Sequence, residues 1–157
     1  MIRIWIKSSL ALLLLVTLSC EREDSCVGEV NYISYGTSFG ECLGYCNQYI
    51  KVYPQIATLS QFGWDKSGEL PEIQCSLPLE SHEFISIRDS VDVGNFFALD
   101  ETYGCPDCAD GGAEWVEISF DTLKHRITFE YLNEPEELTP VVLALRELML
   151  DFEGCDQ

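Results

Sequence analysis

Eight cysteines constrain this chain of 157 residues more strongly than any other feature of its sequence. In an oxidising compartment such cysteines are expected to form disulfides, which hold loops that a small hydrophobic core cannot. Seven of them are candidates for these bridges: Cys26, Cys42, Cys46, Cys75, Cys105, Cys108 and Cys155. Because seven is an odd number, either one thiol stays unpaired or the eighth, Cys20, joins the bridges. The spacing leaves the connectivity open.

The first 20 residues carry the parts of a secretory signal in the usual order. Arg3 and Lys7 are positive, an apolar run extends over Leu10–Val16, and small residues lead up to Cys20. This arrangement resembles the lipobox of bacterial lipoproteins, in which a peptidase cuts before the cysteine and a lipid is attached to its thiol. The resemblance implies a signal peptide over residues 1–19, lipid attachment at Cys20, and a place in the cell envelope facing the periplasm or the exterior.

Two alternatives compete with lipid attachment at Cys20. A transmembrane anchor needs about 18 consecutive apolar residues, and Lys7 leaves an uninterrupted run shorter than that. An ordinary cleaved signal would leave Cys20 as a plain thiol. In the lipoprotein interpretation, residues 20–28 form an acidic tether and residues 29–157 form a single domain, which is long enough to bury a core.

The strong acidity of the chain limits its partners. Cleavage before Cys20 removes Arg3 and Lys7, which changes the net charge from −18 to −20. So acidic a domain lacks the basic surface that nucleic acid requires, and we expect it to meet a membrane only through its lipid. A solvated acidic surface accounts for the charge, while a cationic partner or scattered calcium ligands are the alternatives. We expect no cofactor.

The hydrophobic pattern predicts an α+β domain, with an antiparallel sheet of about five strands packed against two helices. Period-two alternation marks the strands, whereas an apolar stripe at helical spacing marks each helix. Ser81 is the expected cap of the first helix and Thr139 that of the second, followed by Pro140. The expected strands are Glu29–Tyr35, Tyr45–Tyr53, Ile56–Trp64 and a hairpin holding Val116–Phe120 and Ile127–Tyr131; the helices are Ser81–Val91 and one from Thr139; the long loops are Asp65–Pro78 and Asp100–Gly112.

Cys105-Pro-Asp-Cys108 is the sharpest chemical motif in the chain. In thiol oxidoreductases such a pair opens a helix whose N-terminus stabilises the thiolate, but the glycines and acids after Cys108 favour a plain disulfide here. Zinc ligation by the four cysteines of the pairs 42/46 and 105/108 is permitted by spacing and disfavoured by an oxidising compartment. His82 and His125 form no metal motif, and no nucleophile elbow or phosphate loop is present. We therefore expect a protein that is not an enzyme.

The glycine-punctuated segment Thr37–Tyr45 holds the best candidates for contact with a protein partner: Phe39, Gly40 and Leu43. Phe39 and Leu43 are apolar residues between glycines that let a backbone approach closely. In the alternative interpretation both side chains tuck under the loop and only stabilise it.

The layout of the chain is also similar to the emfourin-type small protease inhibitors of bacteria. Those begin with a strand, a glycine-bearing loop and a second strand, followed by a helix, a Phe-Phe pair, a hairpin and a terminal helix. The matching stretches are Tyr32–Gly44, Val91–Leu99, Glu114–Tyr131 and Glu134–Leu148. The resemblance implies an α+β fold and a protease as the candidate partner. The cysteines and the N-terminal signal are additions to the family's pattern, and the layout is equally similar to exported bacterial lipoproteins without a known role.

Overall fold

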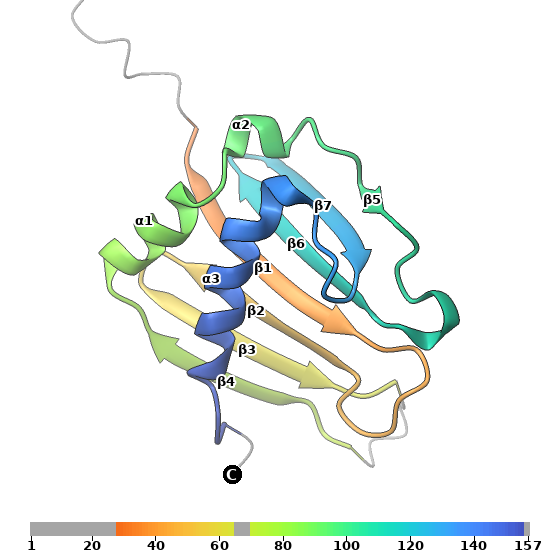
Figure 1. Ribbon diagram of the computed structural model, residues 1–157. Coiled ribbons are helices and arrows are strands. Elements are labelled where there is room, and N and C mark those ends of the chain that lie inside the picture. The colour runs from red at the N-terminus through yellow and green to blue at the C-terminus, as the bar shows by residue number, and fades with distance from the viewer. Residues whose placement is uncertain (1–27, 65–69, 156–157) are drawn as a thin grey trace, which may run out of the picture.

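The computed structural model describes residues 28–64 and 70–155. The expected signal peptide over residues 1–19, Cys20, Cys26 and all of the expected tether except Gly28 therefore lie outside the described residues. Within the described ranges the chain forms one seven-stranded sheet and three α-helices (Figure 1). The strands are β1 (Val30–Ser38), β2 (Asn47–Tyr53), β3 (Ile56–Phe62), β4 (Ile73–Pro78), β5 (Thr102–Tyr103), β6 (Ala113–Phe120) and β7 (Leu123–Glu130), and the helices are α1 (Ser81–Asp89), α2 (Val93–Phe96) and α3 (Thr139–Leu150).

The sheet has the order β4-β3-β2-β1-β6-β7-β5. All neighbouring strands pair antiparallel except β5 and β7, which are parallel. The α+β class is confirmed, whereas the expected sheet of about five antiparallel strands with two helices is corrected to a mixed sheet of seven strands with three helices. The short helix α2 and the edge strands β4 and β5 account for the difference.

Helices α1 and α3 lie on one face of the sheet (Figure 1), and the core fills the space beneath them. Alternate residues of the central strands point into this core because side chains alternate across a strand. Their fully buried side chains meet those of α3, and each contributes about 1.5–3 kcal/mol through removal from water. The core includes Ile33, Ile50, Val52, Val116, Ile118, Ile127 and Phe129 from the strands, and Val141, Val142 and Leu145 from α3.

Both expected helix starts are displaced by one residue. Glu80, not Ser81, caps α1, and it forms a capping box in which Glu83 Oε2 accepts a hydrogen bond from the Glu80 backbone N–H at 2.7 Å. A 3₁₀ turn over Glu136–Leu138 leads into α3, so the chain is already helical at Thr139. No helix within the described part of the chain is long and apolar enough to cross a membrane.

The two segments expected to be long loops both contain strands. Ile73–Pro78 pairs with β3 as an edge strand, with Cys75 opposite Leu59. Thr102–Tyr103 lies beside β7 at the other edge of the sheet. Both strands pair with residues distant in sequence. Thr102–Tyr103 is too short to carry a pattern, whereas Ile73, Cys75 and Leu77 do alternate with polar residues, a local signal that the expected loop overlooked.

Candidate functional site

The loop between β1 and β2, residues 39–46, is the first cysteine loop. Its two ends are joined by the Phe39 N–H, which donates to the Cys46 carbonyl at 3.0 Å. Cys42 and Cys46 form a disulfide across it, with their Cα atoms 5.6 Å apart. Gly44 turns the chain in a left-handed conformation, with φ of +99°, which only glycine adopts without strain. The loop is therefore short, closed and constrained.

The second cysteine loop, residues 104–112, contains the Cys105–Cys108 disulfide. Asp107, Ala109 and Asp110 all have positive φ, and only a three-residue 3₁₀ turn follows Cys108. No α-helix therefore begins at this pair. The backbone amides that would stabilise a reactive thiolate in an oxidoreductase are not arranged for that task here.

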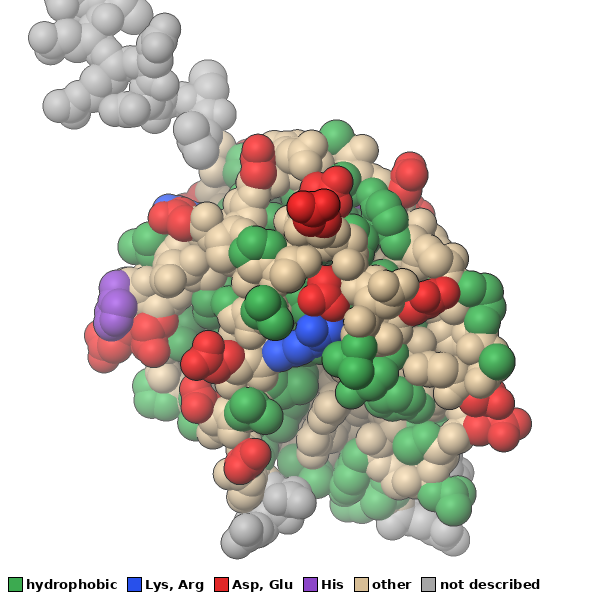
Figure 2. Space-filling model, in the orientation of Figure 1, with side chains coloured by type: hydrophobic (Ala, Val, Ile, Leu, Met, Phe, Trp, Pro, Cys, Tyr) green, Lys and Arg blue, Asp and Glu red, His purple; other side chains and the backbone are tan. Residues whose placement is uncertain are grey.

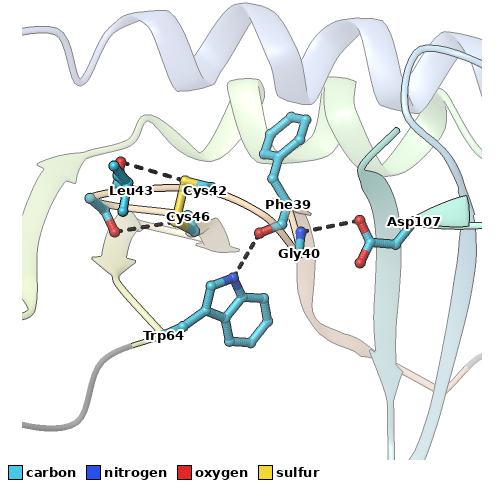
Figure 3. Close-up of a disulfide and its surroundings, with 8 residues drawn as sticks. Phe39, Gly40, Cys42, Leu43, Cys46, Trp64 and Asp107 are labelled. Atoms are coloured by element: carbon cyan, nitrogen blue, oxygen red, sulfur yellow. Dashed lines mark hydrogen bonds between the residues drawn. A yellow bond between two sulfur atoms is a disulfide. The ribbon is translucent and has the colours of Figure 1, made fainter. Parts of the chain in front are cut away.

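One hydrogen bond joins the two cysteine loops at one end of the sheet, and a second ties the first loop to Trp64 (Figure 3). The Gly40 N–H donates to Asp107 Oδ1 at 3.1 Å, which links the first loop to the second. Trp64, just after β3, donates from its indole Nε1 to the Phe39 carbonyl at 2.7 Å. The first loop is thus supported from both sides by residues far away in the sequence.

The three predicted contact residues have different surroundings. Leu43 is fully exposed, so its side chain does not tuck under the loop. The half-buried Phe39 does: its ring packs edge-on against Tyr131, with the ring centroids 4.9 Å apart, and lies against Gly112. Gly40 is exposed and held by Asp107. Leu43 remains the one large apolar side chain that the first cysteine loop presents to solvent.

Six of the seven candidate cysteines lie in three pairs. The third pair joins Cys75 of β4 to Cys155 beyond α3, with Cα atoms 6.1 Å apart. The histidines are not brought together: His82 is exposed on α1, while His125 packs between Phe96 and Phe97. Within the described ranges no three His, Cys, Asp or Glu side chains are placed to hold a metal ion.

A cleft of about 570 Å³ lies beside the C-terminal half of α3, near the first cysteine loop. Figure 2 shows this face of the molecule, where hydrophobic side chains surround a hollow and acidic groups are scattered around it. Phe39 adjoins the cleft through Tyr131, which lines it. Its apolar wall is made by Tyr131, Leu132, Met149, Leu150 and Phe152, and its polar wall includes Tyr35, Glu114 and Arg146.

A charged network closes the inner end of this cleft. Glu114 has no exposed surface, and its carboxylate pairs with Arg146 and accepts a hydrogen bond from the Tyr35 hydroxyl at 3.0 Å. Arg146 also donates to Glu134 at 2.9 Å and, through Nε, to the Tyr35 oxygen at 3.2 Å. Every charged group here has a partner of opposite charge, as burial requires.

The pKa values in this network follow its contacts. Burial raises the pKa of the Tyr35 hydroxyl, and the charge of Glu114 raises it further. Burial also acts to raise the pKa of Glu134, but the hydrogen bond from Arg146, a backbone hydrogen bond and the charge of Arg146 together outweigh it and hold that pKa below its usual value. A carboxylate held ionised in this way suits an ion pair and is poorly suited to act as a general acid.

Sequence reasoning missed this network, although the sequence carries a signal for it. Glu114 precedes Val116 and Ile118 at period two, which places an acid on the core face of its strand. Arg146 lies four residues after Val142, next to the apolar stripe of α3. An acid and an arginine both at core positions predict a buried ion pair.

No model of a known protein family matches this chain, and no curated protein matches it. The contacts of the described residues therefore carry the functional argument.

Proposed function

We propose that this chain is a non-enzymatic, extracytoplasmic binding domain, anchored by a lipid on Cys20, that inserts its first cysteine loop into a protein partner. The observation that carries the proposal is the full exposure of Leu43 on a loop closed by a disulfide. A protease is the candidate partner, by resemblance to the emfourin-type inhibitors.

An exposed leucine alone is weak evidence for a binding site, since much of any protein surface is apolar. The constraint on the loop is what makes Leu43 a candidate anchor. The disulfide, the indole of Trp64 and the carboxylate of Asp107 each fix a different part of the loop before any partner arrives. A loop already ordered loses less conformational entropy on binding, so more of the contact energy becomes affinity.

Three disulfides among the described residues support the proposed compartment. Disulfides form and persist outside the cytoplasm and are rare inside it. The anchor itself has a direct test, the Cys20→Ser variant. We expect this variant to move from the membrane fraction to the soluble envelope fraction, and the lipoprotein proposal fails if it stays with membranes as the parent chain does.

The second candidate function, a thiol or zinc protein built on Cys105 and Cys108, has no observation in its favour. The disulfide leaves neither sulfur as a thiolate ligand for zinc, and no α-helix begins beside the pair to stabilise the thiolate of a redox site. We therefore do not propose it. Titration of thiols on the folded protein, with and without zinc, would reveal such chemistry.

The test of the loop is a comparison of two leucine variants of the full chain. Leu43→Ala removes the proposed anchor, and Leu123→Ala removes a leucine that is 59% exposed at the β6–β7 turn. A partner is first captured from the secreted and envelope proteins of the same cell, then purified, and its dissociation constant is measured by calorimetry. Adding Phe39→Ala to Leu43→Ala tests whether Phe39 supports the loop.

We expect Leu43→Ala to weaken binding at least tenfold, because a buried interface anchor contributes about 2 kcal/mol or more. Leu123→Ala should bind as the parent chain does, and both variants should keep the parent's thermal midpoint. Unchanged affinity in a stable variant lacking both Phe39 and Leu43 would place the binding surface elsewhere. If the captured partner is a protease, loss of its inhibition should follow loss of binding.

A further inference from the structure

The face of the sheet opposite α1 and α3 carries a second feature that the loop proposal does not use. It holds a concavity of about 510 Å³, which we call the open-face hollow, over the centre of the sheet. Small residues of β1, Ser34, Gly36 and Ser38, alternate on this face; Ser34 and Ser38 line the hollow, and Gly36 leaves room for the indole of Trp115. Larger side chains from β2 and β6 stand on either side of these small residues.

The strand register arranges the larger side chains in two adjacent rows across the sheet. One row contains Lys51, Ser34, Glu117 and Arg126 on β2, β1, β6 and β7. The next row contains Tyr49, Gly36, Trp115 and Thr128 on the same four strands. Side chains directly opposite each other on one face interact, so a row with two cations and the carboxylate of Glu117, which leaves one net positive charge, lies against a row with two aromatic rings.

The charge of this face contrasts with that of the chain as a whole, which has a net charge of −18. The described residues include five Lys or Arg side chains: Lys51, Arg88, Lys124, Arg126 and Arg146. Lys51, Lys124 and Arg126 belong to this face. Among the described carboxylates, none lies within ion-pair distance of Lys51 or Lys124. These cations are left to pair with an anion from outside.

Aromatic rings hold the cations in place. The Arg126 guanidinium lies 3.9 Å from the centroid of the Trp115 ring, and Lys51 Nζ lies 4.8 Å from that of Tyr32. Trp115 itself lies over Gly36, where a Cβ atom would come within 2.5 Å of the indole. Glu117 accepts from Arg126 Nε at 3.0 Å and lies 2.9 Å from Nη2, which orients the guanidinium and leaves Nη1 without a partner among the described residues.

The lining of the hollow is rich in hydrogen-bonding groups. Asn47 is only 7% exposed, and its Nδ2 donor has no partner among the described residues. Ser38, Gln48 and Thr128 add further polar groups around the two aromatic rings. A purely aromatic ligand would leave these groups unpaired, and unpaired polar groups weaken binding. The lining favours a ligand that has many hydroxyls, apolar C–H faces and a negative charge.

We propose that the open-face hollow binds an acidic saccharide, a chain of uronic acid residues. The sugar carboxylates pair with Lys51 and with the free Nη1 edge of Arg126, in charge-assisted hydrogen bonds. The C–H face of a sugar ring packs on Tyr49, since the electron-rich face of an aromatic ring attracts such hydrogens. The hydroxyls meet the polar lining, including the amide of Asn47. This site is separate from the first cysteine loop and its protein partner.

The test uses tetragalacturonate as the probe and the full chain in detergent, with binding followed by calorimetry. Maltotetraose is the neutral saccharide of the same length, and 4-phenylbutyrate is a carboxylate with an aromatic ring and no hydroxyls. Lys51→Gln removes a cation from the hollow, and Arg88→Gln removes one from α1 on the opposite face. Asn47→Ala removes the unpaired amide, and thermal midpoints confirm that each variant folds.

We expect tetragalacturonate to bind the parent chain and the Arg88→Gln variant equally, and to bind Lys51→Gln at least tenfold more weakly. Binding should weaken with added salt, and Asn47→Ala should lose affinity without losing thermal stability. Leu43→Ala should bind the saccharide as the parent chain does. The proposal is overturned if tetragalacturonate does not bind, if maltotetraose binds as tightly, if only 4-phenylbutyrate binds, or if Lys51→Gln binds like the parent chain.

Discussion

Replacing Arg146 with methionine should be among the most destabilising single changes in this domain. Methionine keeps most of the apolar stem of arginine but removes its charge. Glu114, with no exposed surface, would then retain only the Tyr35 hydroxyl at 3.0 Å as its partner. Breaking a buried ion pair from one side costs about 3–5 kcal/mol. The Arg146 side chain is 23% exposed, so water can reach the ion pair, and we expect the free energy of unfolding to fall by about 3 kcal/mol.

Urea unfolding at pH 7 measures this loss, and two further variants test its cause. Glu114→Gln combined with Arg146→Met removes both charges and should cost less than Arg146→Met alone. Arg88→Met is the matched control, because Arg88 is 41% exposed and, among the described residues, pairs only with its neighbour Asp89, so its effect should stay within about 0.5 kcal/mol. The reasoning is refuted if Arg146→Met and Arg88→Met have equal effects, or if the double variant is the least stable.

Two other predictions follow from the bridges and from the carboxylates. Replacing Cys75 and Cys155 with serine opens a loop of 80 residues and should lower the free energy of unfolding in urea by about 4.5 kcal/mol. Opening the bridge between Cys42 and Cys46, four residues apart, should lower it by only about 2 kcal/mol. Equal losses would contradict this prediction. Arg126 and Tyr32 lower the pKa of Glu117 against the effect of burial, as Arg146 does for Glu134. A carboxylate whose pKa is lowered in the folded protein stabilises the fold at pH values above its usual pKa of 4.5. Stability should therefore be constant near neutral pH and fall as the pH drops below 4.5. Urea midpoints that do not change between pH 6 and pH 3 would be evidence against this prediction.

The parts of the fold that the sequence predicted are those whose signal is local. The hairpin of β6 and β7 alternates strongly, and Val116, Ile118, Ile127 and Phe129 are all buried as that alternation requires. The last helix was predicted from an apolar stripe, and Val141 and Leu145 lie in the core. Strong period-two and helical patterns determine an element because burial of one face stabilises it.

The parts that the sequence did not predict depend on partners far along the chain. Strand β4 is an edge strand that pairs with β3 and is tied to Cys155 through Cys75, and its short alternating pattern alone did not distinguish it from a loop. The candidate functional site likewise combines features that the local sequence predicts with features that it does not. Leu43 was expected at the surface from its place between glycines, whereas the hydrogen bond between Gly40 and Asp107 joins residues 67 positions apart. No local pattern predicts such a contact, and the same is true of the open-face hollow, which four strands form together.

The direction of β1 has a consequence for how the domain would be presented at a membrane. This strand of nine residues extends for about 30 Å, so its first residue, Val30, and the first cysteine loop lie at opposite ends of the sheet (Figure 1). With a lipid on Cys20, the first cysteine loop would lie at the end of the domain that is farthest from the point of attachment. The face of the sheet that α1 and α3 leave uncovered would then be accessible to molecules that diffuse along the membrane surface.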